Sequence, residues 1–135
     1  MNPEFPIFIP TKGRYKTPYT IRALERISVP FTAVVEKQEY EQYAEVVGKE
    51  RLLVLPHQNQ GLTVTRNWIW DYAVSLGTPY FWTFDDNIVN IWRWNKNRKL
   101  KVDCPTPLRV IEDFTERYEN AYISGMYYFM FINQK

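Results

Sequence analysis

The feature that most constrains this chain is the regular alternation of short apolar runs with segments of helical periodicity. Apolar runs at 6–10, 30–36, 51–55 and 80–84 each have the length of one strand. The segments between them carry apolar residues at helical spacing, and glycine follows two of them, as it often follows a helix. The resulting order of strand, helix, strand, helix, strand, helix and strand predicts an α/β domain with a mostly parallel sheet.

The last third of the chain predicts three more elements. Residues 88–94 alternate in a way that favours a fifth strand, although both sets of side chains are mostly apolar. Thr106 and Pro107 are typical of a helix start, and the apolar run 122–132 predicts a closing strand. A chain of 135 residues without internal repeats fits one domain, so residues 1–135 are expected to form a single α/β unit.

Composition excludes several classes of protein. One cysteine and one histidine allow neither an internal disulfide nor a zinc site built on thiolates or several imidazoles. A net charge of +2 is too small to indicate nucleic acid by itself. We predict no membrane association, because no run is long enough to span a bilayer, and a cytoplasmic location, because Met1–Phe5 does not resemble a signal peptide.

Polar clusters follow three of the predicted strands, and the carboxyl ends of parallel strands meet at one edge of a sheet. The first cluster contains Thr11, Lys12, Gly13 and Arg14, and the second spans residues 57–61. Two cations beside a flexible glycine and a helix start favour binding of a phosphate group. The alternative interpretation is a solvated loop with two surface cations.

The third cluster, Asp85, Asp86 and Asn87, predicts a metal site. These side chains offer only oxygen ligands, which suit Mg²⁺ or Mn²⁺ with phosphate and water completing the shell. Alternate side chains of an extended segment point the same way, so Asp85 and Asn87 are the predicted ligands. Asp86 would then point elsewhere or contact the donor sugar. The alternative is a simple turn, which Asp and Asn also favour.

Two further groups complete the set of candidates. Gly61, Arg66 and Asn67 begin a helix, where the arginine can reach a phosphate or the acidic cluster, or can be an ordinary surface residue. The segment 92–101 interleaves two tryptophans with five cations, a pattern found where proteins follow a nucleic-acid strand. The alternative, which we favour, is a solvated hairpin.

Together these motifs resemble a GT-A glycosyltransferase, a Rossmann-like fold. PIFIPTKGR resembles the nucleotide-contacting first strand and loop, and FDDN resembles the "DxD" metal motif, with Asn87 in place of the last Asp. The segments IFIPTKGR, FDDNI and ISGMYYFMF are similar, more narrowly, to phage glycosyltransferases associated with TET/JBP-type hydroxylases. The resemblance implies a nucleotide-sugar site formed by Thr11, Lys12, Gly13, Arg14, Glu36, Gly61, Arg66, Asn67, Asp85 and Asp86.

That resemblance implies a metal-dependent enzyme with a nucleotide-diphosphate sugar as donor, Mn²⁺ or Mg²⁺ as cofactor, and hydroxymethylated pyrimidines in DNA as acceptor. It names no catalytic base. GT-A enzymes carry acceptor-binding elements beyond the region matched here, so we expect the chain to be truncated before them or to be a reduced form. A nucleic-acid-binding module using residues 93–101, and a nucleotidyltransferase, are the alternative functions.

Overall fold

The computed structural model, which describes residues 1–132, contains a four-stranded sheet in which all strands are parallel. Its strands are β1 (Ile7–Pro10), β2 (Thr32–Val35), β3 (Leu52–Val54) and β4 (Trp82–Thr83), in the order β3-β2-β1-β4. Each lies inside the run that predicted it. The expected α/β, Rossmann-like architecture with a mostly parallel sheet is therefore confirmed.

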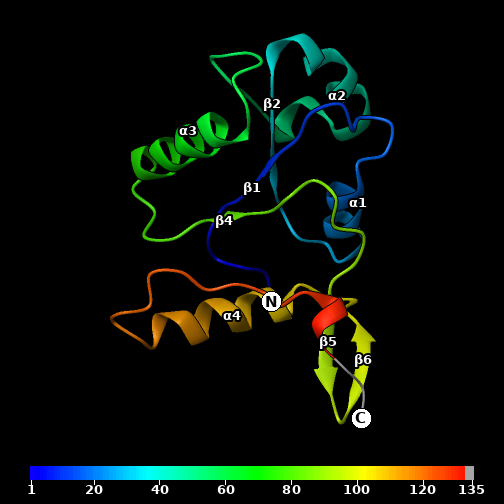
Figure 1. Ribbon diagram of the computed structural model, residues 1–135, viewed down its shortest axis with the longest axis vertical. Coiled ribbons are helices and arrows are strands. Elements are labelled where there is room, and N and C mark those ends of the chain that lie inside the picture. The colour runs from blue at the N-terminus through cyan, green and yellow to red at the C-terminus, as the bar shows by residue number, and fades with distance from the viewer. Residues whose placement is uncertain (133–135) are drawn as a thin grey trace.

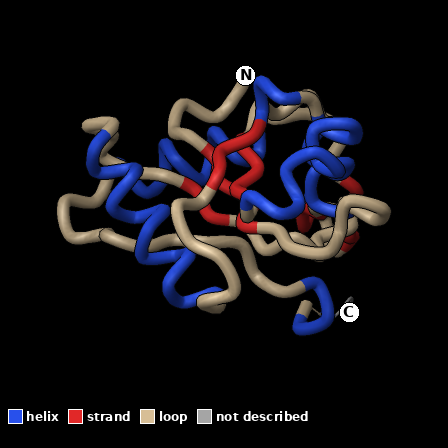
Figure 2. Tube along the Cα trace, turned by 90° about the horizontal axis from the view of Figure 1, so that it is seen from above, coloured by secondary structure: helices blue, strands red, loops and turns tan. Residues whose placement is uncertain are grey.

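Helices cover both faces of the sheet (Figures 1 and 2). They are α1 (Tyr19–Arg26), α2 (Tyr40–Val47), α3 (Leu62–Ser75) and α4 (Thr106–Glu116), with 3-10 turns η1 (Lys37–Glu39), η2 (Lys49–Arg51) and η3 (Phe129–Phe131). In Figure 1, α3 lies on one side of β1 and β4, and α1 and α2 lie on the other. Gly48 follows α2 with a φ of 93°, a conformation that glycine adopts without strain.

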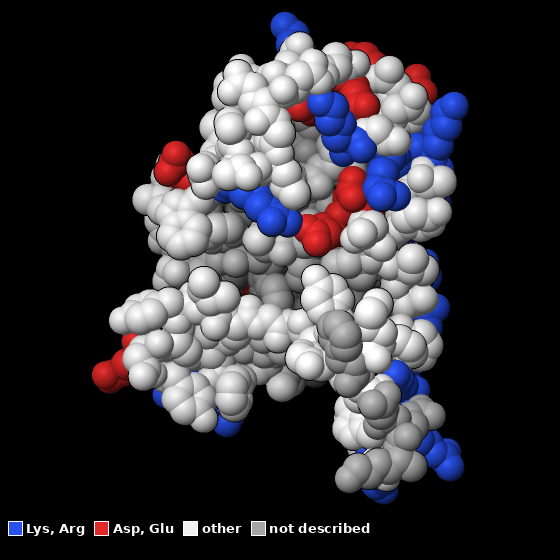
Figure 3. All heavy atoms as spheres, in the orientation of Figure 1, with Lys and Arg blue, Asp and Glu red and all other residues white. Residues whose placement is uncertain are grey.

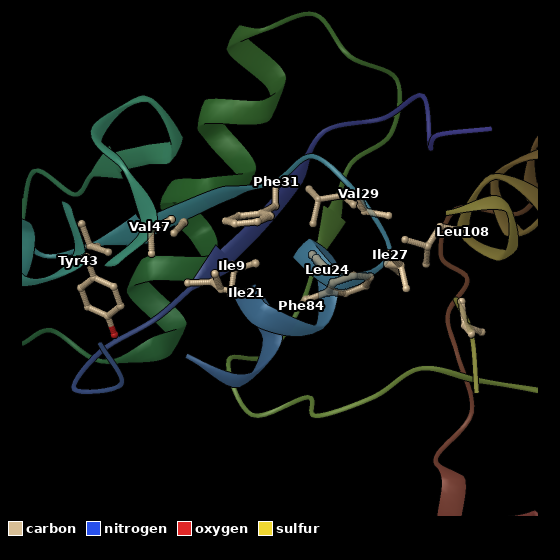
Figure 4. Packing of buried hydrophobic residues seen from close by; sticks show 14 residues of the cluster. Ile9, Ile21, Leu24, Ile27, Val29, Phe31, Tyr43, Val47, Phe84 and Leu108 are labelled. Atoms are coloured by element: carbon tan, nitrogen blue, oxygen red, sulfur yellow. The ribbon is translucent and has the colours of Figure 1, made fainter. Parts of the chain in front are cut away.

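The two faces of the sheet carry two separate hydrophobic clusters. Ile9 of β1 points toward α1, where it lies near Leu24 (Figure 4), and Ile7 belongs to the same cluster. Phe8, between them, points to the opposite face and packs with Ile69 of α3. Burial of both faces explains why the central strands β1 and β2 are mostly apolar in sequence rather than alternating.

A buried carboxylate fastens α4 to the edge of the sheet. Glu112, which is 3% exposed, accepts hydrogen bonds from the backbone amides of Glu4 and Phe5 at 2.7 and 3.1 Å. It also accepts one from the indole of Trp82 at 2.8 Å and forms an ion pair with Arg109 at 3.4 Å. These contacts join the N-terminal segment, the edge strand β4 and α4 into one unit.

The prediction of a strand over 88–94 is wrong in its first half. The segment that follows Asn87 is bound instead to α1: Ile88 donates its amide to the Thr20 hydroxyl at 2.9 Å, and Arg26 donates to the Val89 carbonyl at 2.5 Å. Because these backbone groups are engaged by α1, no strand forms there. The strand begins at residue 92, and β5 (Trp92–Asn95) pairs antiparallel with β6 (Arg98–Lys101).

The closing strand predicted over 122–132 is also absent. Residues 121–128 have no regular secondary structure, and η3 follows them. Tyr122 and Ile123 are 81% and 89% exposed, so the apolar run does not line the core. Phe129 instead packs its ring on Trp92 at a centroid distance of 5.1 Å. Within residues 1–132, no helix combines the length and the apolar character needed to cross a membrane.

Candidate functional site at the carboxyl edge of the sheet

A pocket of about 410 Å³ opens at the carboxyl edge of the sheet, where β1 lies between β2 and β4. Strand order reverses at this point, and open parallel sheets bind ligands in such crevices. Figure 3 shows a hollow whose rim carries both basic and acidic side chains. The pocket is lined by Pro10, Thr11, Lys12, Val34, Glu36, Leu55, Gly61, Leu62, Thr65, Arg66, Asp85, Asp86 and Asn87.

The loop after β1 is held in shape by α2 and by the turn that precedes it. Tyr43, which is fully buried, shares a hydrogen bond of 2.8 Å with the Thr11 hydroxyl and accepts one from the Arg14 amide at 3.0 Å. The hydroxyl of Tyr43 points toward this loop in Figure 4. Gly13 has a φ of 68° and donates its amide to both carboxylate oxygens of Glu39 at 3.0 Å. These contacts fix the loop at the rim of the pocket.

The turn after β4 is held by a hydroxyl group of α1. Thr20, which is 1% exposed, donates to the Asp85 carbonyl at 2.5 Å and accepts from the Ile88 amide at 2.9 Å. Asp86 points toward the loop after β1 and binds Thr11 at 3.1 Å and Arg14 at 2.9 Å. The loops after β1 and β4 therefore lie at one edge of the sheet, as predicted.

Glu36, at the end of β2, is a carboxylate inside the pocket wall with 5% exposure. It forms an ion pair with Lys12 at 3.1 Å and accepts the amide of Asn59 at 3.0 Å. Burial raises the pKa of the Glu36 carboxyl, but the bonds from Lys12, Asn59 and Gln38 outweigh it and hold the pKa below its usual value. Glu36 is therefore an ionised acceptor facing the pocket.

Arg66 comes from α3 and completes the ring of charges around the pocket. Its guanidinium lies 2.5 Å from Asp85, and both side chains are about half exposed, at 47% and 53%. The Asn87 side chain lines the pocket, and it forms no hydrogen bond within residues 1–132. Asp85 is thus half exposed but paired with Arg66, the Asn87 side chain has no partner among residues 1–132, and Asp86 is bonded to the loop after β1.

The pocket contains the predicted donor-binding residues except Gly13, Arg14 and Asn67. Gly13 and Arg14 hold the loop after β1 in place, because Gly13 donates its amide to Glu39 and Arg14 donates its guanidinium to Asp86. Asn67 faces a second cavity of about 670 Å³ between α3, β4 and α4, which shares Arg66 with the pocket.

The sequence profile of TET-associated glycosyltransferases matches residues 5–135, which is nearly the whole chain. The chain belongs to the TET-associated glycosyltransferase family. This family name indicates a glycosyltransferase, and an enzyme of that kind requires a sugar donor. No curated protein and no solved structure matches the chain.

The oxygen-bearing side chains of the pocket are of a kind that could bind a divalent cation. Asp85 and Asn87 both line this cavity, and a carboxylate and an amide oxygen are ligands that suit Mg²⁺ or Mn²⁺. Among residues 1–132, no three acidic, histidine or cysteine side chains gather in a way that could hold a metal ion. A cation held here would therefore need oxygens from a bound ligand, such as a diphosphate.

Two residues that shape the loops around the pocket could not be identified from the sequence. Thr20 and Tyr43 lie on α1 and α2, and neither of them was assigned to the site from the sequence. Both are buried, and a buried hydroxyl needs a hydrogen-bond partner, which here is a loop distant in sequence. Helical spacing predicts the burial of such residues, but it does not reveal the loops they bind.

Proposed function

We propose that the pocket at the carboxyl edge of the sheet binds a nucleotide-diphosphate sugar together with Mn²⁺ or Mg²⁺, and that the chain transfers the sugar. One observation carries this proposal: cations and carboxylates from three strand ends and one helix surround a single cavity. Lys12, Arg66 and the start of α3 favour the diphosphate, and Asp85 and Asn87 favour the cation. A nucleotide-diphosphate sugar with a bound cation carries negative charge for the basic side chains and positive charge for the acidic ones.

In glycosyl transfer the bond between the anomeric carbon and the diphosphate breaks, so negative charge develops on the leaving diphosphate. Lys12 and Arg66 are the side chains of this pocket that stabilise that charge. A bound divalent cation supplies Lewis-acid stabilisation of the same group. Glu36 presents an ionised acceptor suited to hydroxyl groups of the nucleotide or the sugar.

We further propose hydroxymethylated pyrimidines in DNA as the acceptor. The support is the similarity of IFIPTKGR, FDDNI and ISGMYYFMF to phage glycosyltransferases associated with TET/JBP-type hydroxylases. Incubation of the protein with hydroxymethylated oligonucleotides, Mn²⁺ and a panel of nucleotide sugars should give a mass increase of one hexose or related sugar. An unmodified oligonucleotide is the control, and equal modification of both would contradict this acceptor.

The donor site is tested by isothermal titration of nucleoside diphosphates, first with Mn²⁺ and then with a chelator. The expected result is tight binding only when the cation is present, because Asp85 and Asn87 alone provide too few ligands for it. Asp85→Ala should abolish the cation effect. Asp71→Ala removes an exposed carboxylate of α3 outside the pocket and serves as the matched control.

Equal affinity with Mn²⁺ and with chelator would refute the metal site. A cation effect that survives in Asp85→Ala would also refute it, whereas a loss shared by Asp71→Ala would indicate a general effect of charge. Release of pyrophosphate from a nucleoside triphosphate would favour the nucleotidyltransferase alternative instead.

A further inference from the structure

The β5–β6 hairpin is a narrow ribbon that extends from the body of the molecule, at the lower end of Figure 1. Its strands are joined by a two-residue turn at Lys96 and Asn97, whose φ values are 46° and 63°. Positive φ at both central positions is typical of the tight turns whose twist matches that of the paired strands. The ribbon is therefore a defined element rather than a loose loop.

The hairpin carries an unbalanced positive charge. Residues 87–102 contain no Asp or Glu, whereas they contain Arg93, Lys96, Arg98, Lys99 and Lys101. None of these cations forms an ion pair with a described residue. The pocket differs in this respect, because its cations all have acidic partners. In Figure 3, the basic side chains at the hairpin end of the molecule have no acidic neighbours on the face shown.

One face of the ribbon combines aromatic rings with cations. Trp92 is paired with Lys101, and Trp94 with Lys99. Directly opposed residues of an antiparallel pair project from the same face, so the two rings and the two cations lie together. The tryptophans are 41% and 42% exposed, although both would be expected to be buried if they served only the core.

The base of the ribbon is anchored, so this face has a fixed position. The amide of Val102, which is 5% exposed, donates to the Ile91 carbonyl at 2.9 Å. Phe129 packs on the ring of Trp92, and Lys99 donates to the Phe129 carbonyl at 2.9 Å. Trp94, nearer the turn, makes no ring contact within residues 1–132 and is exposed to a ligand.

We propose that the β5–β6 hairpin binds single-stranded nucleic acid, with its cations on the phosphates and Trp94 stacked on an unpaired base. Cations follow the backbone of a single strand, and exposed rings accept bases of any sequence. Both features occur here on one ribbon without a competing carboxylate. The surface lies outside the pocket, so its binding does not depend on the proposed donor or cation.

The test is fluorescence anisotropy of labelled oligothymidylate with the full chain, at several salt concentrations and without nucleotide sugar or metal. The variant K96Q/K99Q/K101Q, which removes the turn cation and the two cations opposite the tryptophans, should lower the affinity at low salt by roughly tenfold or more, and should reduce the slope of log affinity against log salt by about 2. Trp94→Ala should lower the affinity by roughly tenfold with little change in that slope.

Two variants provide matched controls. K37Q/K49Q/R117Q removes the same charge from exposed cations on other elements, and Trp70→Ala removes a tryptophan that is 58% exposed on α3. Both should bind the oligonucleotide as the wild type does. Thermal melting verifies that every variant is folded.

Three results would overturn the proposal: no binding by the wild type at low salt, equal losses in the hairpin and control triple variants, or unchanged affinity in Trp94→Ala. Tighter binding of duplex than of single strand would exclude the single-stranded assignment. Retained oligonucleotide binding in a protein that fails to bind nucleoside diphosphate would sustain this proposal and contradict the proposed function alone.

Discussion

Replacing Arg66 with alanine perturbs both charges that the pocket is proposed to recognise. The Arg66 guanidinium is 2.5 Å from Asp85, and both side chains are about half exposed. An ion pair with this exposure contributes about 0–1 kcal/mol. Arg66→Ala therefore frees Asp85 for a cation, and Mn²⁺ affinity without nucleotide should rise by no more than about fivefold.

The effect on nucleotide binding should be larger and of opposite sign. A hydrogen bond from a charged donor to a ligand is worth about 1.5–3 kcal/mol, which corresponds to roughly a 10- to 150-fold change in affinity. Because Arg66 lines the pocket, its loss should weaken nucleoside diphosphate binding by an amount within this range. The loss of phosphate binding outweighs the release of Asp85, so affinity in the presence of Mn²⁺ should fall overall.

Isothermal titration measures both effects, with Mn²⁺ alone and with nucleoside diphosphate in excess Mn²⁺. Arg51→Ala is the matched control, because Arg51 is an arginine of similar exposure, paired with Glu25 at 2.9 Å near the amino end of β3. It should leave both affinities unchanged. Nucleotide affinity within twofold of the wild type in Arg66→Ala would refute the role assigned to this guanidinium.

Three other substitutions give distinct outcomes. Thr20→Val removes the hydroxyl that binds the Asp85 carbonyl and the Ile88 amide. It should lower the free energy of unfolding in urea by about 1–3 kcal/mol and weaken Mn²⁺-dependent nucleotide binding. Unchanged stability would contradict this role of the hydroxyl. Glu36 has a lowered pKa in the fold, so its stabilisation is present above its ordinary value of 4.5 and is lost as the pH falls through the lower folded value. Glu36→Gln should therefore unfold with less pH dependence below about pH 4.5 than the wild type, and parallel acid profiles would contradict this. Glu112→Ala leaves several buried donors without an acceptor and should destabilise the fold by about 3 kcal/mol or more, measured by urea unfolding; a loss under 1 kcal/mol would show that α4 is held by other contacts.

The first half of the fold was predictable because its central strands, β1 and β2, are buried on both faces. A strand of this kind must be apolar at every position, so runs such as 30–36 stand out from the amphipathic helices between them. The ends of most predicted runs differ from the ends of the strands by one or two residues, since flanking residues remain apolar outside the hydrogen-bonded ladder. The differences are largest for β2 and for the edge strand β4, which are each three residues shorter than the runs 30–36 and 80–84.

The last third was less predictable because apolar character does not specify a partner. The run 122–132 has the composition of a strand, but within residues 1–132 no neighbouring strand pairs with it. Its Tyr122 and Ile123 are exposed, and its Phe129 contacts the hairpin. The prediction of a strand over 88–91 was wrong for a different reason. Thr20 and Arg26 of α1 bind backbone groups of this segment, which are therefore engaged outside the sheet.

The candidate site was predictable where topology alone fixes position. Parallel strands place their carboxyl ends at one edge, so polar clusters after three strands had to converge whatever the loop details. The partners within that edge were not predictable, since they depend on side-chain direction. Asp86 bonds Arg14 across two loops, and Lys12 bonds Glu36, whereas none of these four residues was predicted from the sequence to pair with another.

These internal partners bear on what the pocket can select. Lys12 and Arg66 are already paired with Glu36 and Asp85, so a simple anion must break ion pairs and leave a carboxylate without its cation. A simple cation faces the converse problem, because it must displace an arginine from Asp85. A diphosphate that carries a divalent cation can replace both partners at once and leave neither charge unpaired. On the proposed function, selection by paired charges would favour the metal complex of the donor over phosphate or metal alone, and we expect nucleotide and metal to bind cooperatively.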